Sequence, residues 1–92
     1  MSSVEAKFTV QGELGLHARP AGRFVTLAGG FESEIWVARE GDEEWVSGNS
    51  VLSILSLAAS QGTVLRLRVE GPDAAAAVEA LGALLSEPAQ TI

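Results

Sequence analysis

The pattern of apolar residues predicts an α+β domain, an open-faced sandwich in which three helices cover one face of a four-stranded antiparallel sheet. Segments that alternate between apolar and polar residues recur along the chain, and segments with helical spacing stand between them. The order is strand, helix, strand, strand, helix, strand, helix, which suits helices packed on an antiparallel sheet. With 92 residues, 47% of them hydrophobic, the whole chain, residues 1–92, is expected to form one domain.

The first strand and the first helix are predicted from the first third of the chain. Residues 4–10 alternate strictly between apolar and polar side chains, as a strand with one face on the core does. After a glycine-containing loop, apolar residues recur at helical spacing over 21–28, and Pro20 suits a first helical turn, where its missing N–H breaks no bond. Gly29 and Gly30 are expected to end the helix, because glycine adopts the left-handed conformation at little cost.

A hairpin is predicted in the middle of the chain. Residues 31–38 alternate again, and after a polar turn residues 43–46 are expected to return as the antiparallel partner. Trp36 and Trp45 would then face each other across the hairpin as an aromatic pair with a structural role.

The last three elements complete the pattern. Residues 47–50 offer several helix-capping side chains before the short apolar segment 51–57, which is therefore predicted to be a helix. Residues 64–70 alternate as a strand, and residues 71–73 begin the final helix. Gly82 costs that helix about 1 kcal/mol relative to alanine unless close packing requires it. Its buried stripe is expected to comprise Ala74, Val78, Leu81 and Leu85.

Composition excludes several classes of function. The formal net charge is −6 and the isoelectric point is near 4.5, which argues against the basic surface that nucleic acids or anionic membranes require. The absence of cysteine excludes disulfides and thiolate metal or redox sites. No segment approaches the roughly 20 apolar residues of a membrane span. We therefore expect a cytoplasmic protein with no metal site, no cofactor, no nucleic-acid partner and no membrane contact.

The single histidine stands where an anion would be well held. His17 lies between the glycine-containing loop and the helix begun by Pro20, with Arg19 two residues on. A helix N-terminus presents unpaired N–H groups, and a guanidinium can clamp phosphate oxygens with paired donors. A neutral imidazole at this place is a nucleophile that could accept a phosphoryl group. A surface histidine that caps the helix is the alternative from the residues alone.

Two segments resemble a known family. Gly15-Leu-His-Ala-Arg-Pro-Ala21 resembles the active-site signature of the HPr family, the small phosphocarriers of the bacterial phosphoenolpyruvate-dependent phosphotransferase system. Asn49 to Leu57 is similar to that family's regulatory-serine helix, and the resemblance extends from about Val4 to Leu85. It implies the HPr-like fold and a single HPr domain, in agreement with the order of elements above.

The resemblance implies roles for residues of the loop and the first helix. His17 would take a phosphoryl group on Nδ1 from phosphorylated enzyme I and pass it to a histidine of a IIA-type protein. Arg19 would contact the phosphate, and Ala18 and Pro20 would set the helix end that receives it. The protein would thus be a monomeric phosphoryl carrier, a covalent intermediate of the cascade rather than a stand-alone enzyme, serving sugar uptake, its regulation, or both.

The resemblance also implies regulatory and docking roles for the second helix. Ser50 stands at the family's regulatory position and would be the target of an HPr kinase/phosphorylase; plain capping of the helix is the alternative. Val51, Leu52 and Leu55 correspond to apolar residues that the family exposes to its partners. The buried pair of this helix is expected to be Ile54 and Leu57.

Several residues depart from the sugar-transport members of the family. Leu14 stands where they often have Asn or Ser, and Lys7 is the only lysine in the chain. Leu14, the Asn49-Ser50 pair and Arg23, which is also expected to contact partners, resemble the nitrogen-related branch called NPr. Both branches therefore stay open.

A competing interpretation belongs to a different class of function. A non-catalytic α+β module could bind an anion or metabolite with His17 and Arg19 and perform no phosphoryl chemistry. A phosphohistidine phosphatase would need an additional base or nucleophile, and the sequence supplies none.

Overall fold

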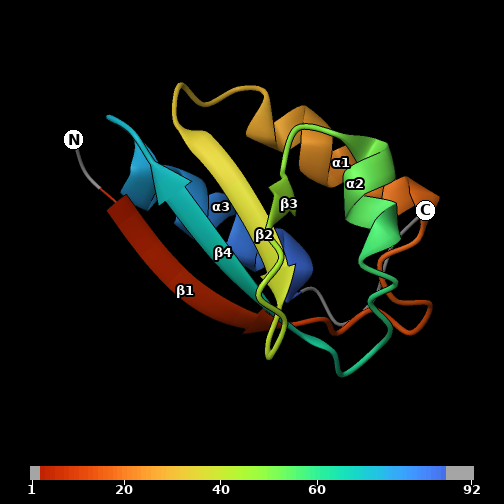
Figure 1. The fold of residues 1–92 in the computed structure, drawn as a ribbon. Coiled ribbons are helices and arrows are strands. Elements are labelled where there is room, and N and C mark those ends of the chain that lie inside the picture. Colours follow the sequence, from red (N-terminus) through yellow and green to blue (C-terminus); the bar gives the residue numbers. More distant parts are fainter. Residues whose placement is uncertain (1–2, 87–92) are drawn as a thin grey trace.

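The computed structural model describes residues 3–86 and contains the expected elements in the expected order (Figure 1). The strands form one antiparallel sheet in the order β1-β4-β2-β3. This confirms the predicted open-faced sandwich. The elements are β1 (Ser3–Thr9), α1 (Ala18–Ala28), β2 (Glu34–Arg39), β3 (Val46–Ser47), α2 (Val51–Ser56), β4 (Val64–Glu70) and α3 (Ala74–Leu85).

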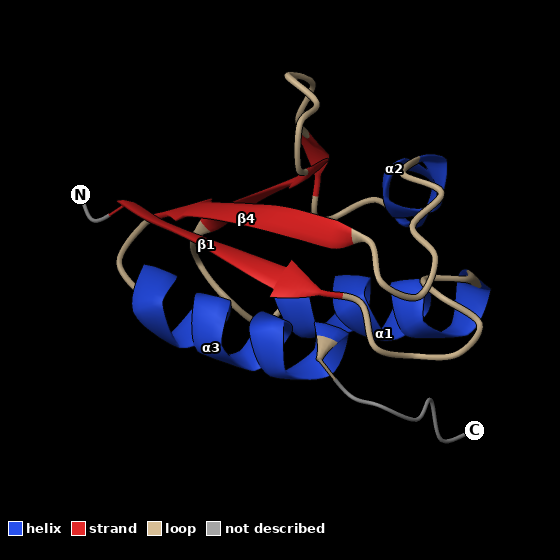
Figure 2. Cartoon of the chain, turned by 90° about the horizontal axis from the view of Figure 1, so that it is seen from below, coloured by secondary structure: helices blue, strands red, loops and turns tan. Residues whose placement is uncertain are grey.

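Two helices lie on one face of the sheet, and the third lies against the edge strand β3. Figure 2 shows α1 and α3 on the same side of the strands, and α3 contacts both β1 and β4. The short helix α2 packs against α1 and β3. Within residues 3–86, no helix is both long and apolar enough to cross a bilayer.

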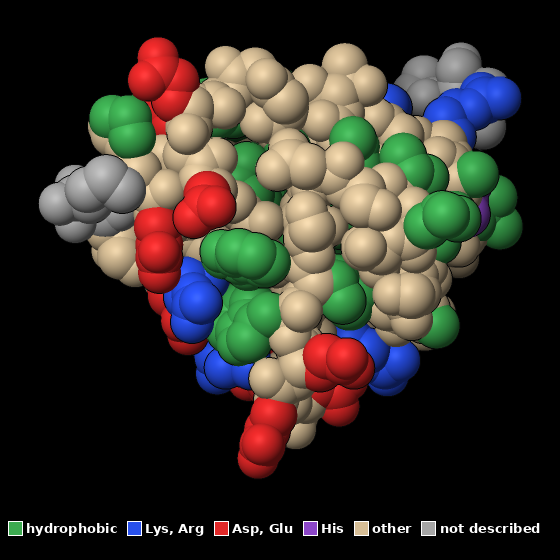
Figure 3. Space-filling view, turned by 45° about the horizontal axis from the view of Figure 1, so that its top comes forward, with side chains coloured by type: hydrophobic (Ala, Val, Ile, Leu, Met, Phe, Trp, Pro, Cys, Tyr) green, Lys and Arg blue, Asp and Glu red, His purple; other side chains and the backbone are tan. Residues whose placement is uncertain are grey.

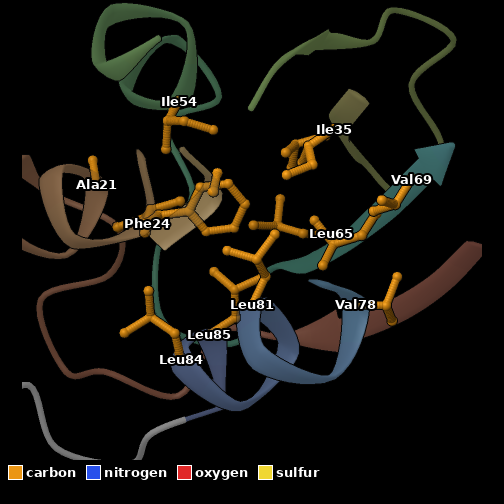
Figure 4. Packing of buried hydrophobic residues seen from close by; sticks show 14 of the residues in the cluster. Ala21, Phe24, Ile35, Ile54, Leu65, Val69, Val78, Leu81, Leu84 and Leu85 are labelled. Atoms are coloured by element: carbon orange, nitrogen blue, oxygen red, sulfur yellow. The ribbon is translucent and has the colours of Figure 1, made fainter. Parts of the chain in front are cut away.

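The core forms between the sheet and the helices because the strands alternate as the sequence predicts. On β4 every second residue is buried, and β2 adds Ile35 and Val37 from the neighbouring strand. Phe24 of α1 and Ile54 of α2 point into the same cluster, as Figure 4 shows. The predicted stripe of α3 is buried and is wider than expected. Its buried residues are Ala74, Ala77, Val78, Leu81, Gly82, Leu84 and Leu85.

Gly82 is explained by close packing rather than by helix propensity. A β-carbon at this position would overlap the aromatic ring of Phe8, which is half-buried on β1. The glycine therefore lets α3 approach the edge strand closely, at the propensity cost of about 1 kcal/mol.

The hairpin is shorter than the alternation predicts. β2 begins at Glu34 rather than at residue 31, and its partner β3 comprises only two residues, Val46 and Ser47, so residues 43–45 lie outside the sheet. Trp36 pairs with Ser47, which means that the predicted cross-strand pairing of Trp36 with Trp45 is wrong.

Trp45 instead covers two arginines of the central strand. Its ring centroid lies 4.6 Å from the guanidinium carbon of Arg66 and 5.1 Å from that of Arg68. Cation–π attraction of this kind can hold an indole over a basic surface without any ladder hydrogen bond. The Arg66 guanidinium also donates to the Asp42 carbonyl oxygen at 2.8 Å, so the loop after β2 is tied to β4 rather than extended as a strand.

The first helix ends without the left-handed glycine that was expected. Gly29 has a right-handed φ of −65°, and the chain leaves the helix through a tighter turn. In that turn the N–H of Gly30 donates to the carbonyl oxygen of Leu27, and the N–H of Phe31 donates to that of Ala28. These three-residue steps satisfy the last carbonyl groups of the helix in the manner of a 3₁₀ turn.

Asp73 joins the start of α3 to the turn before β2. Its carboxylate accepts from the Ser33 hydroxyl at 2.5 Å, from the Ser33 N–H at 3.0 Å and from the Glu32 N–H at 2.9 Å. The Ser33 hydroxyl, followed by the Glu32 N–H, lowers the pKa of Asp73 below its ordinary value. The same contacts explain why β2 begins late, since residues 32 and 33 bond to Asp73 instead of a strand.

Replacing Gly82 and Gly22 by alanine distinguishes the effect of close packing on stability from the effect of helix propensity. Gly82→Ala should lower the free energy of unfolding, because overpacking costs about 1–3 kcal/mol and the propensity gain is only about 1 kcal/mol. Gly22→Ala in α1 is the matched control, since nothing lies within 4 Å of its added β-carbon, and it should raise the unfolding free energy by about 1 kcal/mol. Urea denaturation measures both changes. Equal stabilisation by the two substitutions would contradict the close packing of Gly82 on Phe8.

The Asp73 contacts should make folding stability depend on acid pH. Because the folded-state pKa is lowered, the carboxylate stabilises the fold above the unfolded-state pKa of about 3.9, and this stabilisation is lost as the pH falls through the folded value. Ser33→Ala should raise the pKa of Asp73 toward its ordinary value and weaken the pH dependence of the urea midpoint between pH 5 and pH 2. Carbon-detected NMR titration of the Asp73 carboxyl group measures the pKa directly. An unchanged Asp73 titration in Ser33→Ala would show that the hydroxyl is not the main cause.

Candidate functional site

The loop before α1 is held against the segment that follows α2. The Leu16 N–H donates to the Ala59 carbonyl oxygen at 2.9 Å, and the Leu16 side chain is buried. Gly15 has a φ of +70°, and a β-carbon there would come within 2.8 Å of the Ser60 Cα. Only glycine can adopt that conformation and also approach the Ser60 backbone so closely. Gly15 therefore allows the loop before His17 to pack against residues 59 and 60.

His17 occupies the N-cap position of α1. Its backbone is extended, and its carbonyl oxygen accepts the first helical hydrogen bond, from the Ala21 N–H at 2.9 Å. The imidazole makes no capping bond, which removes the simple capping alternative. Its Nε2 atom is buried and has no hydrogen-bond partner among residues 3–86. The ring as a whole is half-buried.

The first turn of α1 supplies donors and positive charge beside this ring. The N–H groups of Ala18 and Arg19 stand at the helix end ahead of buried Pro20, and no acidic residue lies in the first turn. The side chain of Arg19 is exposed. Arg23, one turn further on, is also exposed and borders a hollow of about 530 Å³. The other residues lining this hollow are Gly22, Thr26, Leu27 and Leu84.

The second helix brings exposed apolar side chains to the same end of the molecule. Leu52 is 80% exposed and Val51 is 36% exposed, whereas Ile54 is fully buried, as expected. Leu57 is buried as well, which confirms the predicted pair. Leu55 is half-buried and packs against the core, so it offers less free surface than Leu52.

Ser50 caps α2. Its Oγ accepts from the Ser53 N–H at 3.2 Å, and its backbone is extended, as an N-cap residue requires. The capping role that the sequence offered as an alternative is therefore present in the structure, and the side chain is half-buried.

Exposed apolar side chains and the histidine lie together on one side of the molecule. In Figure 3 the purple histidine is seen among green hydrophobic side chains, while acidic side chains gather elsewhere in the view. Leu14, in the loop before His17, is 73% exposed. Within residues 3–86, no group of three or more His, Cys, Asp or Glu residues could hold a metal ion.

The contribution of residues 57–60 to the site is not visible in the sequence. These residues support the loop through a backbone carbonyl group and through close packing, and neither needs a particular side chain. Gly15 is the only local signal, because a glycine so close to the histidine suggests a close approach of backbone without naming its partner.

Comparison with known proteins agrees with this geometry. A family model described as the PTS HPr component phosphorylation site matches residues 4–87. The phosphocarrier protein HPr of Neisseria meningitidis is 40% identical over 74 residues, which cover 80% of this chain and 81% of the relative. That of Haloferax volcanii is 39% identical over 85 residues, which cover 92% and 96%.

The fold agrees with a solved structure as well. The crystal structure of a phosphocarrier protein HPr from Bacillus anthracis superimposes with a TM-score of 0.86 at 35% identity, covering 94% of this chain and 100% of that one. The family model spans nearly the whole described domain, including the loop and helix end that present His17. The chain therefore belongs to the HPr family of phosphocarriers of the phosphotransferase system.

Proposed function

We propose that this carrier holds its phosphoryl group on His17 Nδ1, receiving it from phosphorylated enzyme I and delivering it to a histidine of a IIA-type protein. The observation that carries the proposal is the placement of His17 as the N-cap of α1, with Nε2 buried and Arg19 exposed in the first turn. The roles of the individual residues follow from that placement.

The burial of Nε2 supports Nδ1 as the reacting atom. A neutral imidazole attacks through the nitrogen that carries a lone pair, and an atom closed off by protein cannot meet a phosphorus atom on another protein. In the transfer, the new bond forms between Nδ1 and phosphorus while the bond between phosphorus and the donor breaks. Delivery reverses this exchange and regenerates the free imidazole.

The helix end supports the charge that arrives with the group. The free N–H groups of Ala18 and Arg19 and the positive end of the helix dipole favour an anion at this place. The exposed guanidinium of Arg19 can offer two parallel donors to phosphate oxygens, and Pro20 presets the backbone of the turn. Because no acidic residue lies in this turn, nothing there opposes the incoming charge.

The partners would dock on a largely uncharged surface beside the histidine. We call Val51, Leu52 and the edge formed by Leu55 the docking face, with Arg23 as its positive neighbour. Residues 47–63 contain no charged side chain, although the chain has a net charge of −6. An apolar surface with cations at its border would pack against an apolar patch on the partner, with its charges at the rim.

Phosphorylation of Ser50 would regulate this docking. Phosphorylation by an HPr kinase/phosphorylase would replace the capping hydroxyl with a group of about −1.5 to −2 charge. The helix N-terminus tolerates that charge, whereas an apolar partner surface does not. The single domain over residues 1–92, the monomeric state and the cytoplasmic location belong to the same proposal. Leu14, the Asn49-Ser50 pair and Arg23 resemble the NPr branch, and the proposal covers sugar uptake, its regulation, or both.

The first prediction of this proposal concerns the phosphorylated atom. Incubation with phosphoenolpyruvate and enzyme I should label the protein once, with the acid lability of phosphohistidine, and His17→Ala should abolish the label. Arg19→Lys is the graded control: it keeps the charge but loses the planar pair of donors, so it should slow labelling without abolishing it. Circular dichroism checks that both variants fold. A label that survives in His17→Ala would exclude the carrier mechanism in favour of modification elsewhere.

The second prediction separates docking from core packing on α2. Leu52→Glu should raise the apparent KM for enzyme I about tenfold or more while leaving Tm unchanged, because its side chain is exposed but would be desolvated in the complex. Leu55→Glu should lower Tm, because this side chain packs against the core. Kinetic and thermal measurements on the two variants test the assignment. An unchanged KM in Leu52→Glu would remove Leu52 from the docking face.

A further inference from the structure

The residue after the C-terminal end of α2 has a strained backbone. Ala58 has a φ of +51° and is the only residue other than glycine with a positive φ among residues 3–86. The left-handed region is costly for a residue with a β-carbon, and helix ends that need it usually carry Gly or Asn. The side chain of Ala58 is exposed, so it does not pack against the core in a way that would account for the strain.

The strained turn directs a carbonyl group toward the histidine loop. Immediately after Ala58, the Ala59 carbonyl oxygen accepts from the Leu16 N–H at 2.9 Å, and both residues are buried. Gly15 packs against the backbone of Ala59 and Ser60. His17 is the next residue after Leu16. A change in the φ of Ala58 would therefore move the Ala59 carbonyl group away from the Leu16 N–H.

The same segment is supported from the sheet. The Arg39 guanidinium, at the end of β2, donates to the Leu57 carbonyl oxygen at 3.1 Å, and the Ala58 N–H donates to the Leu55 carbonyl oxygen at 3.0 Å. Strained backbone persists where surrounding contacts determine it, and it is concentrated at functional sites. Here the contacts on either side of Ala58 join the sheet, α2 and the histidine loop.

We propose that Ala58 is a positioning residue for His17, and that its left-handed conformation holds the Ala59 carbonyl group that seats Leu16. The role in phosphoryl transfer rests on the proposed function above, whereas the seating of the loop does not. Ala58 touches neither the imidazole nor the transferred group. It acts through one hydrogen bond, from Leu16 to Ala59, and that bond is an independent quantity to measure.

A series of substitutions at this exposed position tests backbone conformation rather than packing. Ala58→Gly and Ala58→Asn tolerate a positive φ, whereas Ala58→Val opposes it, and Asn and Val differ little in size. Hydrogen exchange of the Leu16 amide should stay within about twofold of the parent in Ala58→Gly and Ala58→Asn. In Ala58→Val, exchange of the Leu16 amide should become at least tenfold faster relative to exchange of the Leu67 amide. Leu67 lies in the centre of β4, so its exchange reports on global opening.

The NMR signals of the His17 ring and the rate of phosphoryl transfer should change in Ala58→Val and stay unchanged in Ala58→Gly and Ala58→Asn. In Ala58→Val the NMR signals of the unphosphorylated His17 ring should shift, and transfer from phosphorylated enzyme I should slow by about tenfold. Ala58→Gly and Ala58→Asn should retain the parent values. If the parent accepts no phosphoryl group, the proposed function fails, and the exchange and ring signals still decide whether Ala58 seats the loop.

Arg39→Met provides a second route if Ala58→Val does not fold. It removes the guanidinium that supports the Leu57 carbonyl group while leaving Ala58 itself unchanged, and it should also speed exchange of the Leu16 amide relative to Leu67. Parent-like Leu16 exchange and His17 signals in a folded Ala58→Val would overturn the proposal, even if Tm falls. The same parent-like result in Arg39→Met would overturn it where Ala58→Val cannot be measured.

Discussion

The antiparallel pairing of β1 with β4 is the constraint on which the site depends. The ladder continues past the strand ends, because the Val10 N–H donates to the Thr63 carbonyl oxygen at 2.9 Å and the Gly62 N–H donates to that of Val10 at 2.8 Å. The chain that leaves β1 and the chain that enters β4 must therefore lie side by side. As a result, the loop before His17 meets the segment after α2, although the two are more than 40 residues apart.

The short helix α2 contributes to both the core and the surface because it packs on α1 and on the edge strand β3 with one face only. Ile54 is fully buried in the same core cluster as Phe24, while Leu52, two residues earlier, is 80% exposed. A helix of six residues is too short to be stable through hydrogen bonding alone, so its capping serine and its single buried face hold it in place. Because α2 contacts α1, the helix that begins after His17, its exposed face belongs to the same side of the molecule as the histidine, where Figure 3 shows hydrophobic side chains around it.

Two glycines allow the backbone to come unusually close to a neighbouring segment. Gly82 lets α3 approach Phe8, and Gly15 lets the histidine loop approach Ala59 and Ser60. Like Gly15, Ala58 has a positive φ, although it carries a β-carbon. The first of these contacts stabilises the sandwich, whereas the other two lie beside His17. The positive backbone φ angles of Gly15 and Ala58 are therefore found close to His17 in the chain or through the Leu16–Ala59 hydrogen bond.

The sequence by itself determined the features that depend on neighbouring residues. Alternation predicted β1 and β4, the spacing around His17 predicted a helix start, and Ser50 was recognised as a cap. Tertiary structure alone decided the shortened β3, the placement of Trp45 over Arg66 and Arg68, and the seating of Leu16 on Ala59. Local periodicity and capping act within one or two turns of chain. The other contacts join distant segments, and their energies depend on how the packed sheet and helices place them.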